Sequence, residues 1–220
     1  MSRVDSRKVR PPQSRRGRRR RQLIRQRRQV LAATLLILGG WLGCSTLVAL
    51  HEPPSYLNYG KPLSTLIVAQ PIDASKTSLR IEKSHYRLLL YYEREPIKAY
   101  PVVFGPEPQG DKRYENDGRT PEGDFILRDR YLHPNWSRFL WLDYPTEAAQ
   151  AQYRQAKQAG QIPAQAVLGG DIAIHGVPQG RDDLIDQRIN WTDGSIALKN
   201  RDIEELYSVV QVGTKVTILP

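Results

Sequence analysis

Apolar residues are distributed unevenly along the 220 residues of this chain. Residues 1–29 hold few of them, residues 30–50 form an apolar run without a formal charge, and short apolar stretches recur from residue 78 onward. At about 1.5 Å per residue, a helix of residues 30–50 covers the roughly 30 Å of a bilayer core. The pattern predicts a transmembrane helix followed by a folded domain at residues 78–220. A buried core helix is the alternative, but no face of this run is polar.

Within that domain, short stretches rich in aromatic and β-branched residues predict strands. They lie at residues 78–81, 86–92, 98–104, 124–127, 171–174 and 214–219. Residues 136–144 read as a further strand, with Leu140 and Leu142 in the core. Two helices are expected, at residues 146–159 and from residue 200 to about 210, the first capped by Thr146 and ended by Gly160. The sequence therefore predicts a mainly β domain with a few short helices.

Two stretches carry little periodicity. Residues 51–77 hold four prolines, Pro53, Pro54, Pro62 and Pro71, and predict a linker between the membrane and the domain. Residues 105–123 form a long loop, and a loop of that length inside a compact domain is usually functional or disordered. Thr120, near its end, is first a structural turn residue, with a direct contact to substrate as the alternative.

Charge separates the tail from the rest of the chain. The formal net charge is +10, yet residues 1–29 hold twelve Arg, one Lys and one Asp, a net of +12, so residues 30–220 sum to −2. We read the tail as disordered. Nucleic-acid binding through it is disfavoured because an apolar run separates it from the domain. The positive-inside rule places the tail in the cytoplasm and the domain outside it, as a single-pass membrane protein.

The cysteine and histidine content excludes several kinds of site. Cys44 is the only cysteine, so no intramolecular disulfide can form. None of the four histidines shows metal-ligand spacing, and we expect no metal and no cofactor. Two processing alternatives stay open: the apolar run could be a cleaved signal peptide, or Cys44 could carry a lipid.

Candidate chemistry lies in the last third of the chain. His175 follows the apolar stretch Asp171 to Ile174, and Ser195 follows Thr192, Asp193 and Gly194 in a polar turn. A histidine and a hydroxyl on neighbouring elements form the base and nucleophile of an acyl transfer. On spacing alone, a structural histidine and an ordinary turn serine are the more frequent explanation.

Three segments favour a catalytic role for His175 and Ser195. They are GRTPEGDF (118–125), DIAIHG (171–176) and TDGSIAL (192–198). In this order they resemble the L,D-transpeptidase catalytic domain, also called the YkuD domain, in its branch of periplasmic murein enzymes whose last motif reads T-D-G-C. The match covers about residues 78–220. The resemblance implies a β-sandwich-like catalytic fold that lies in the periplasm, with residues 30–50 in the inner membrane.

The resemblance also implies roles for individual residues. Ser195 occupies the position of the nucleophilic Cys and His175 that of the general base. Gly176 would orient the imidazole through its backbone carbonyl. The amides around Gly194 would face the oxyanion. Asp193 replaces the second His of the commoner motif, and a turn-forming role is its alternative.

Ser195 is the main departure from the family pattern. A thiol ionises near pH 8.5, whereas a serine hydroxyl needs a strong base and a good oxyanion site. The serine could be an engineered replacement, a natural loss or a natural serine-dependent variant. Arg138 could bind a carboxylate of the substrate if residues 136–144 form a wall of the substrate groove. The alternative is that this segment is a strand of the core and that Arg138 has no contact with substrate.

The implied reaction is attack on the L,D peptide bond of a peptidoglycan tetrapeptide stem, with release of D-alanine. The acyl group would pass to an amine of another stem or of a protein lysine, or to water in a peptidase. Whether the protein is an active enzyme with Ser195 in place of the cysteine stays open. A murein hydrolase and an inactive peptidoglycan-binding pseudoenzyme are the alternatives.

Overall fold

The computed structural model describes residues 56–67 and 72–220. The basic tail and the predicted transmembrane helix at residues 30–50 lie outside the described residues. No helix within the described part is both long and apolar enough to cross a membrane.

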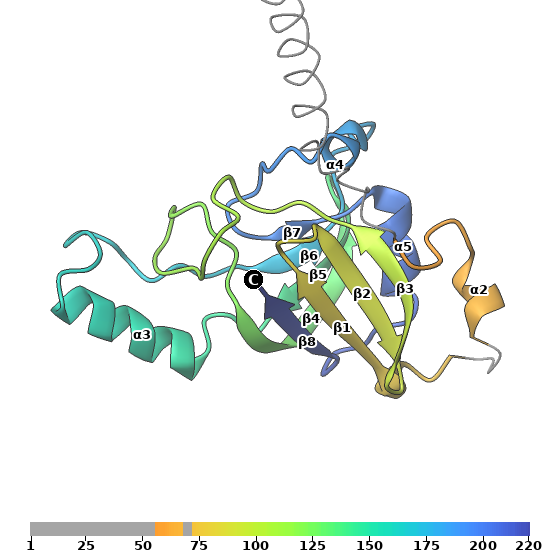
Figure 1. The fold of residues 1–220 in the computed structure, drawn as a ribbon, viewed down its shortest axis with the longest axis horizontal. Coiled ribbons are helices and arrows are strands. Elements are labelled where there is room, and N and C mark those ends of the chain that lie inside the picture. Colours follow the sequence, from red (N-terminus) through yellow and green to blue (C-terminus); the bar gives the residue numbers. More distant parts are fainter. Residues whose placement is uncertain (1–55, 68–71) are drawn as a thin grey trace, which may run out of the picture. The chain divides into compact units, whose positions relative to one another are not determined.

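Eight strands form one mixed sheet in the order β3-β2-β1-β8-β4-β5-β6-β7 (Figure 1). They are β1 (Thr77–Glu82), β2 (Arg87–Tyr92), β3 (Glu95–Pro101), β4 (Gly123–His133), β5 (Ser137–Leu142), β6 (Ala173–His175), β7 (Ile196–Ala197) and β8 (Lys215–Leu219). The pairs β1 with β8 and β6 with β7 are parallel, and the other neighbouring pairs are antiparallel. The final strand of the chain thus lies in the middle of the sheet and joins its two halves.

Strand β4 is long enough, at 11 residues, to belong to both halves. Its beginning pairs with β8 and its remainder with β5, and the register shifts between Leu127 and Asp129. Such an irregularity bends a strand and increases its twist. The sheet is curled, and one hydrophobic core contains residues of both halves, among them Leu79, Leu88, Leu140 and Ile174. The predicted mainly β fold with few helices is confirmed, with a single curled sheet as its form.

The longest helix, α3 (Glu147–Gln158), begins and ends where its sequence signals predict. The Ala149 N–H donates to Thr146 Oγ1 at 3.2 Å, and Gly160 adopts a φ of 64° beyond the helix. Ala156 is the one buried residue of α3, and Figure 1 shows the helix at the margin of the domain, away from the sheet. Its alanine-rich apolar positions explain this light packing.

The second predicted helix, α5 (Asn200–Tyr207), packs on the core. Its buried residues Ile203 and Leu206 are three positions apart and therefore share one face. Short helices not predicted from sequence are α2 (Leu63–Leu66), the 3₁₀ turn η1 (Ala74–Lys76) and α4 (Asp183–Asp186).

Part of the predicted linker belongs to the folded domain. Leu63 and Ile67 are buried. Tyr59 Oη donates to Asp202 Oδ2 at 2.7 Å, and the Leu63 N–H donates to Glu205 Oε1 at 3.0 Å. Residues 56–67 are thereby attached to α5. The prolines of the predicted linker do not prevent the contact, because Leu63 and Ile67 still bury their side chains and the carboxylates of α5 accept hydrogen bonds from Tyr59 and Leu63.

Candidate active site

Strands β6 and β7 bring the two candidate side chains to one face of the sheet. The parallel pairing sets Ile174 beside Ile196 and His175 beside Ala197. One position earlier, the Ala173 N–H donates to Ser195 Oγ at 3.2 Å. Because side chains alternate along a strand, His175 lies on the Ser195 side, about two residue rises or 7 Å further along. Both residues line the same cavity.

His175 is held as a neutral base. Its ring is 3% exposed, and Nδ1 lies 2.7 Å from the Gly176 carbonyl oxygen. A carbonyl only accepts, so Nδ1 carries the hydrogen and Nε2 keeps its lone pair. Burial lowers the pKa of His175 to about 4, despite the opposing hydrogen bond to Gly176. At neutral pH the imidazole can therefore accept a proton at Nε2.

Residue 176 has no space for a side chain. A Cβ there would lie 2.2 Å from Asn200 Oδ1 and 2.5 Å from the Trp136 carbonyl oxygen. The Gly176 N–H donates to that same Trp136 oxygen at 3.0 Å. Glycine at this position lets the backbone approach closely enough to fix the carbonyl that orients His175.

Aromatic rings enclose the imidazole. The ring centroid of His175 lies 4.7 Å from Trp136, 5.5 Å from Phe139 and 5.7 Å from Trp191. His133 stacks on the Trp136 ring at 4.4 Å. These apolar surfaces exclude water, which is the physical cause of the lowered pKa.

The cavity beside His175 and Ser195 has a volume of about 430 Å³. Its walls come from the long loop, from strands β4 and β5, from the segment before β6, and from the turn before β7. The lining residues are Lys112, Glu115, Asn116, Tyr131, His133, Trp136, Phe139, Trp141, Gly169, Gly170, Asp171, His175, Trp191, Thr192, Asp193 and Ser195. The lining combines aromatic side chains, most of them from β4, β5 and the turn between these strands, with polar side chains from the loop and the turn before β7, a mixture typical of ligand pockets.

Thr192 organises the turn that carries Ser195. Its Oγ1 donates to the Ser195 carbonyl at 2.7 Å and accepts the Gly194 N–H at 3.3 Å. The Gly194 amide, which the resemblance assigns to the oxyanion, is therefore engaged within the turn. From the sequence, a turn-forming role was the alternative for Asp193. In the structure, Thr192 supplies these side-chain hydrogen bonds of the turn.

Gly194 sits directly against the long loop. A Cβ there would lie 2.5 Å from the Arg119 carbonyl oxygen, and its φ is +122°. The loop itself is held by Lys83, whose Nζ donates to the carbonyl oxygens of Gly110 at 2.6 Å and Thr120 at 3.0 Å. A loop tied in this way forms a fixed wall of the cavity.

With this geometry in place, comparison with known proteins identifies the domain. The family model of the YkuD L,D-transpeptidase catalytic domain matches residues 76–218. The chain belongs to this family. A comparison with curated proteins gave no match.

Several solved structures resemble this L,D-transpeptidase domain. The helical cell shape determining protein Pgp2 from Campylobacter jejuni is 25% identical, with 64% of this chain and 46% of that chain covered at a TM-score of 0.47. Bd1075 from Bdellovibrio bacteriovorus is 18% identical, with 69% and 49% covered at 0.46. An L,D-transpeptidase from Mycobacterium smegmatis is 11% identical, with 66% and 59% covered at 0.44. The chain spans about half the length of these proteins.

Two predicted substrate contacts of the L,D-transpeptidase domain lie away from the cavity. Arg138 donates to the Ser137 carbonyl at 3.0 Å and lies 3.9 Å from Glu204 of α5. Its neighbour Phe139 points to the cavity instead, since side chains alternate along β5. Thr120 is fully buried, and neither Arg138 nor Thr120 lines the cavity. Leu140 and Leu142 are fully buried, which confirms the core expectation for them.

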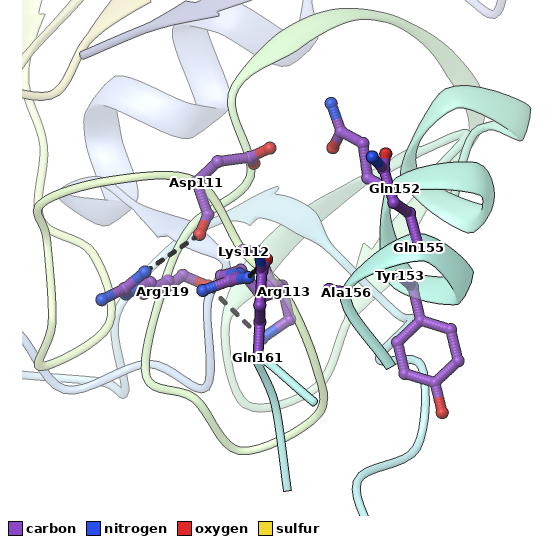
Figure 2. Close-up of a pocket in the computed structure, with 9 residues that line it drawn as sticks. All are labelled: Asp111, Lys112, Arg113, Arg119, Gln152, Tyr153, Gln155, Ala156 and Gln161. Atoms are coloured by element: carbon purple, nitrogen blue, oxygen red, sulfur yellow. Dashed lines mark hydrogen bonds between the residues drawn. The ribbon is translucent and has the colours of Figure 1, made fainter. Parts of the chain in front are cut away.

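A second pocket, of about 330 Å³, lies between the long loop and α3. Figure 2 shows Asp111, Lys112, Arg113 and Arg119 on the loop side of the pocket, across from the helix that carries Gln152 and Gln155. Lys112 lines both pockets and so forms part of the partition between them.

Sequence reasoning missed Lys112, His133 and Trp191, which all line the cavity. Trp191 directly precedes the T-D-G-S turn, so its position was a usable signal. Lys112 and His133 carried none, because they reach the cavity through the loop and the β4–β5 hairpin. Among the described residues, no cluster of three His, Cys, Asp or Glu could hold a metal ion.

Proposed function

We propose that this domain binds peptidoglycan stem peptides and that residue 195 accepts the acyl group of the stem, with His175 as general base. The observation that carries the proposal is the shared cavity, into which a neutral, oriented imidazole and the residue-195 side chain both project. Family membership supports the reaction class.

The chemistry follows from the two side chains. Residue 195 attacks the carbonyl carbon of the L,D peptide bond while its proton moves to Nε2 of His175. Collapse of the tetrahedral intermediate breaks the C–N bond, and the imidazolium returns the proton to the departing D-alanine amine. An amine of another stem or of a protein lysine then takes the acyl group, or water does so in a hydrolase.

The serine attenuates this reaction. His175 Nδ1 donates to a backbone carbonyl, whereas a Ser-His-Asp triad places a carboxylate there to stabilise the imidazolium. Burial with a pKa of about 4 makes the imidazole a weak base. A thiol ionises readily beside such a base, but a hydroxyl does not.

Residues 30–50 anchor the protein in the inner membrane in this proposal, with the tail in the cytoplasm and the L,D-transpeptidase domain in the periplasm. The support is the uncharged apolar run and the net charge of +12 on residues 1–29. That location would place the cavity within reach of peptidoglycan.

Intact-mass spectrometry tests the acyl transfer directly. The full chain, with Cys44→Ala, is incubated with a tetrapeptide stem or with a carbapenem, an acylating inhibitor class of this family. We expect little adduct on Ser195 and a stoichiometric thioester on the Ser195→Cys variant. Adding His175→Gln to the latter should abolish the adduct, because the thiol loses its proton acceptor.

Ser208→Cys is the matched control, since Ser208 is exposed on α5's end and outside the cavity. Equal acylation of the unaltered chain and the Ser195→Cys variant would show that the serine does not weaken the reaction and that Ser195 is itself an effective nucleophile. Acylation of neither would favour a peptidoglycan-binding pseudoenzyme.

A further inference from the structure

Lys112 is a buried cation in contact with the turn that carries Ser195. Its side chain is 2% exposed. Nζ lies 2.9 Å from Asp117 Oδ1, 3.4 Å from the Arg119 carbonyl oxygen and 3.5 Å from the Asp193 carbonyl oxygen. Nζ is also 3.3 Å from where a Cβ of Gly194 would stand. In Figure 2 the residue lies in the loop that faces α3, and it also lines the cavity that holds His175 and Ser195.

The partner carboxylate holds its negative charge on the side of the loop. Asp117 Oδ2 accepts the N–H groups of Arg113 at 2.6 Å and Tyr114 at 3.2 Å, and Oδ1 accepts the Arg119 N–H at 3.0 Å. Burial opposes ionisation of Asp117, but these hydrogen bonds and the Lys112 ammonium together keep its pKa below the usual range. The pair is thus a dipole whose positive end adjoins the turn and whose negative end lies in the loop.

We infer that Lys112 is a positioning residue of the L,D-transpeptidase site: its ammonium holds the Asp193–Gly194 backbone and presents positive charge to the nucleophile at position 195. The inference rests on the proposed function of residue 195. A nearby cation in a water-poor cavity stabilises a thiolate or an oxyanion, since the low dielectric leaves its field unscreened. A role in packing alone would not use the charge.

Other titratable side chains line the same cavity. They are Tyr131 and His133 from β4, the neutral His175 from β6, Asp193 in the turn, Asp171 before β6 and Glu115 from the loop. The Asp171 side chain is 84% exposed, so water screens it. The side chains of Lys112 and Asp117 are only 2% and 4% exposed, so solvent screens their charges far less.

The pKa of an introduced thiol measures this field. The full chain carries Cys44→Ala and Ser195→Cys, and the pH dependence of iodoacetamide alkylation reports the thiol pKa. Lys112→Met should raise that pKa by about one unit, since it removes a buried positive charge that contacts the Asp193 backbone two residues before the thiol. Asp117→Asn should lower it by a similar amount, because the ammonium then loses its counter-charge. Lys98→Met, which removes a buried lysine of β3 outside both the loop and the cavity, should leave it unchanged.

The opposite signs separate charge from packing. A merely structural ion pair would loosen the turn in both variants and shift the thiol pKa in one direction, which would overturn the inference. Should Lys112→Met fail to fold, Asp117→Asn decides alone: a lowered thiol pKa supports the inference, and an unchanged or raised one refutes it. The measurement uses no peptidoglycan, so absence of acylation by stem peptides would reject the proposed function while leaving this result readable.

Discussion

Acid should destabilise this domain through the imidazole of His175. The ring is buried among Trp136, Phe139 and Trp191 and is neutral in the folded state. In the unfolded chain it meets water and takes up a proton near its ordinary pKa of 6.5, whereas burial lowers the folded pKa to about 4. Because the unfolded state then binds more protons, stability is full above pH 6.5 and falls as the pH approaches 4.

The magnitude follows from these two pKa values. Proton uptake by the unfolded state alone should remove about 1.4 kcal/mol of unfolding free energy at pH 5.5 and about 2.5 kcal/mol at pH 4.5. Asp117 adds a loss at lower pH, because its folded pKa is also depressed. A variant lacking the imidazole isolates the contribution of His175.

Urea unfolding followed by tryptophan fluorescence supplies the measurement, at pH values from 7.5 to 4.5. The unaltered chain should lose stability relative to His175→Gln by the amounts given above. His85→Gln is the matched control, because the His85 side chain is 59% exposed. A difference between the unaltered chain and His175→Gln that stays constant with pH would refute the argument that burial suppresses the charge.

Three further predictions concern the loop, the turn and the anchor. Lys83→Met should lower the unfolding free energy by about 3 kcal/mol, because it leaves buried acceptors unpaired. Lys76→Met, at an exposed ion pair, should leave the unfolding free energy nearly unchanged in the same urea assay. Gly194→Ala should cost more than Gly180→Ala, since both have positive φ but only position 194 meets a backbone oxygen; equal thermal shifts would contradict this. A topology reporter fused after Pro220 should be active only outside the cytoplasm, and deleting residues 30–50 should release the protein from membranes; a mature form starting near residue 50 would instead indicate a cleaved signal.

Local features of the sequence determined much of the fold. Stretches rich in aromatic and β-branched residues located most of the strands, and Thr146 and Gly160 set the ends of α3. These signals act over a few residues, through side-chain alternation and capping, and so can be read without the fold. The family resemblance likewise rested on contiguous motifs, and the family model confirms it over residues 76–218.

The tertiary structure decided which side chains meet. Strand β7 has two residues, too few for a pattern, yet its pairing with β6 sets Ser195 beside Ala173. Arg138 turned toward α5 rather than the cavity because the register of β5 decides which alternate positions face inward. The contact of Lys112 with Asp193 spans 81 positions of the chain. Pairings of this kind depend on how the curled sheet brings distant backbone segments together. A pattern over a few neighbouring residues holds no information about which distant residues will lie close in space.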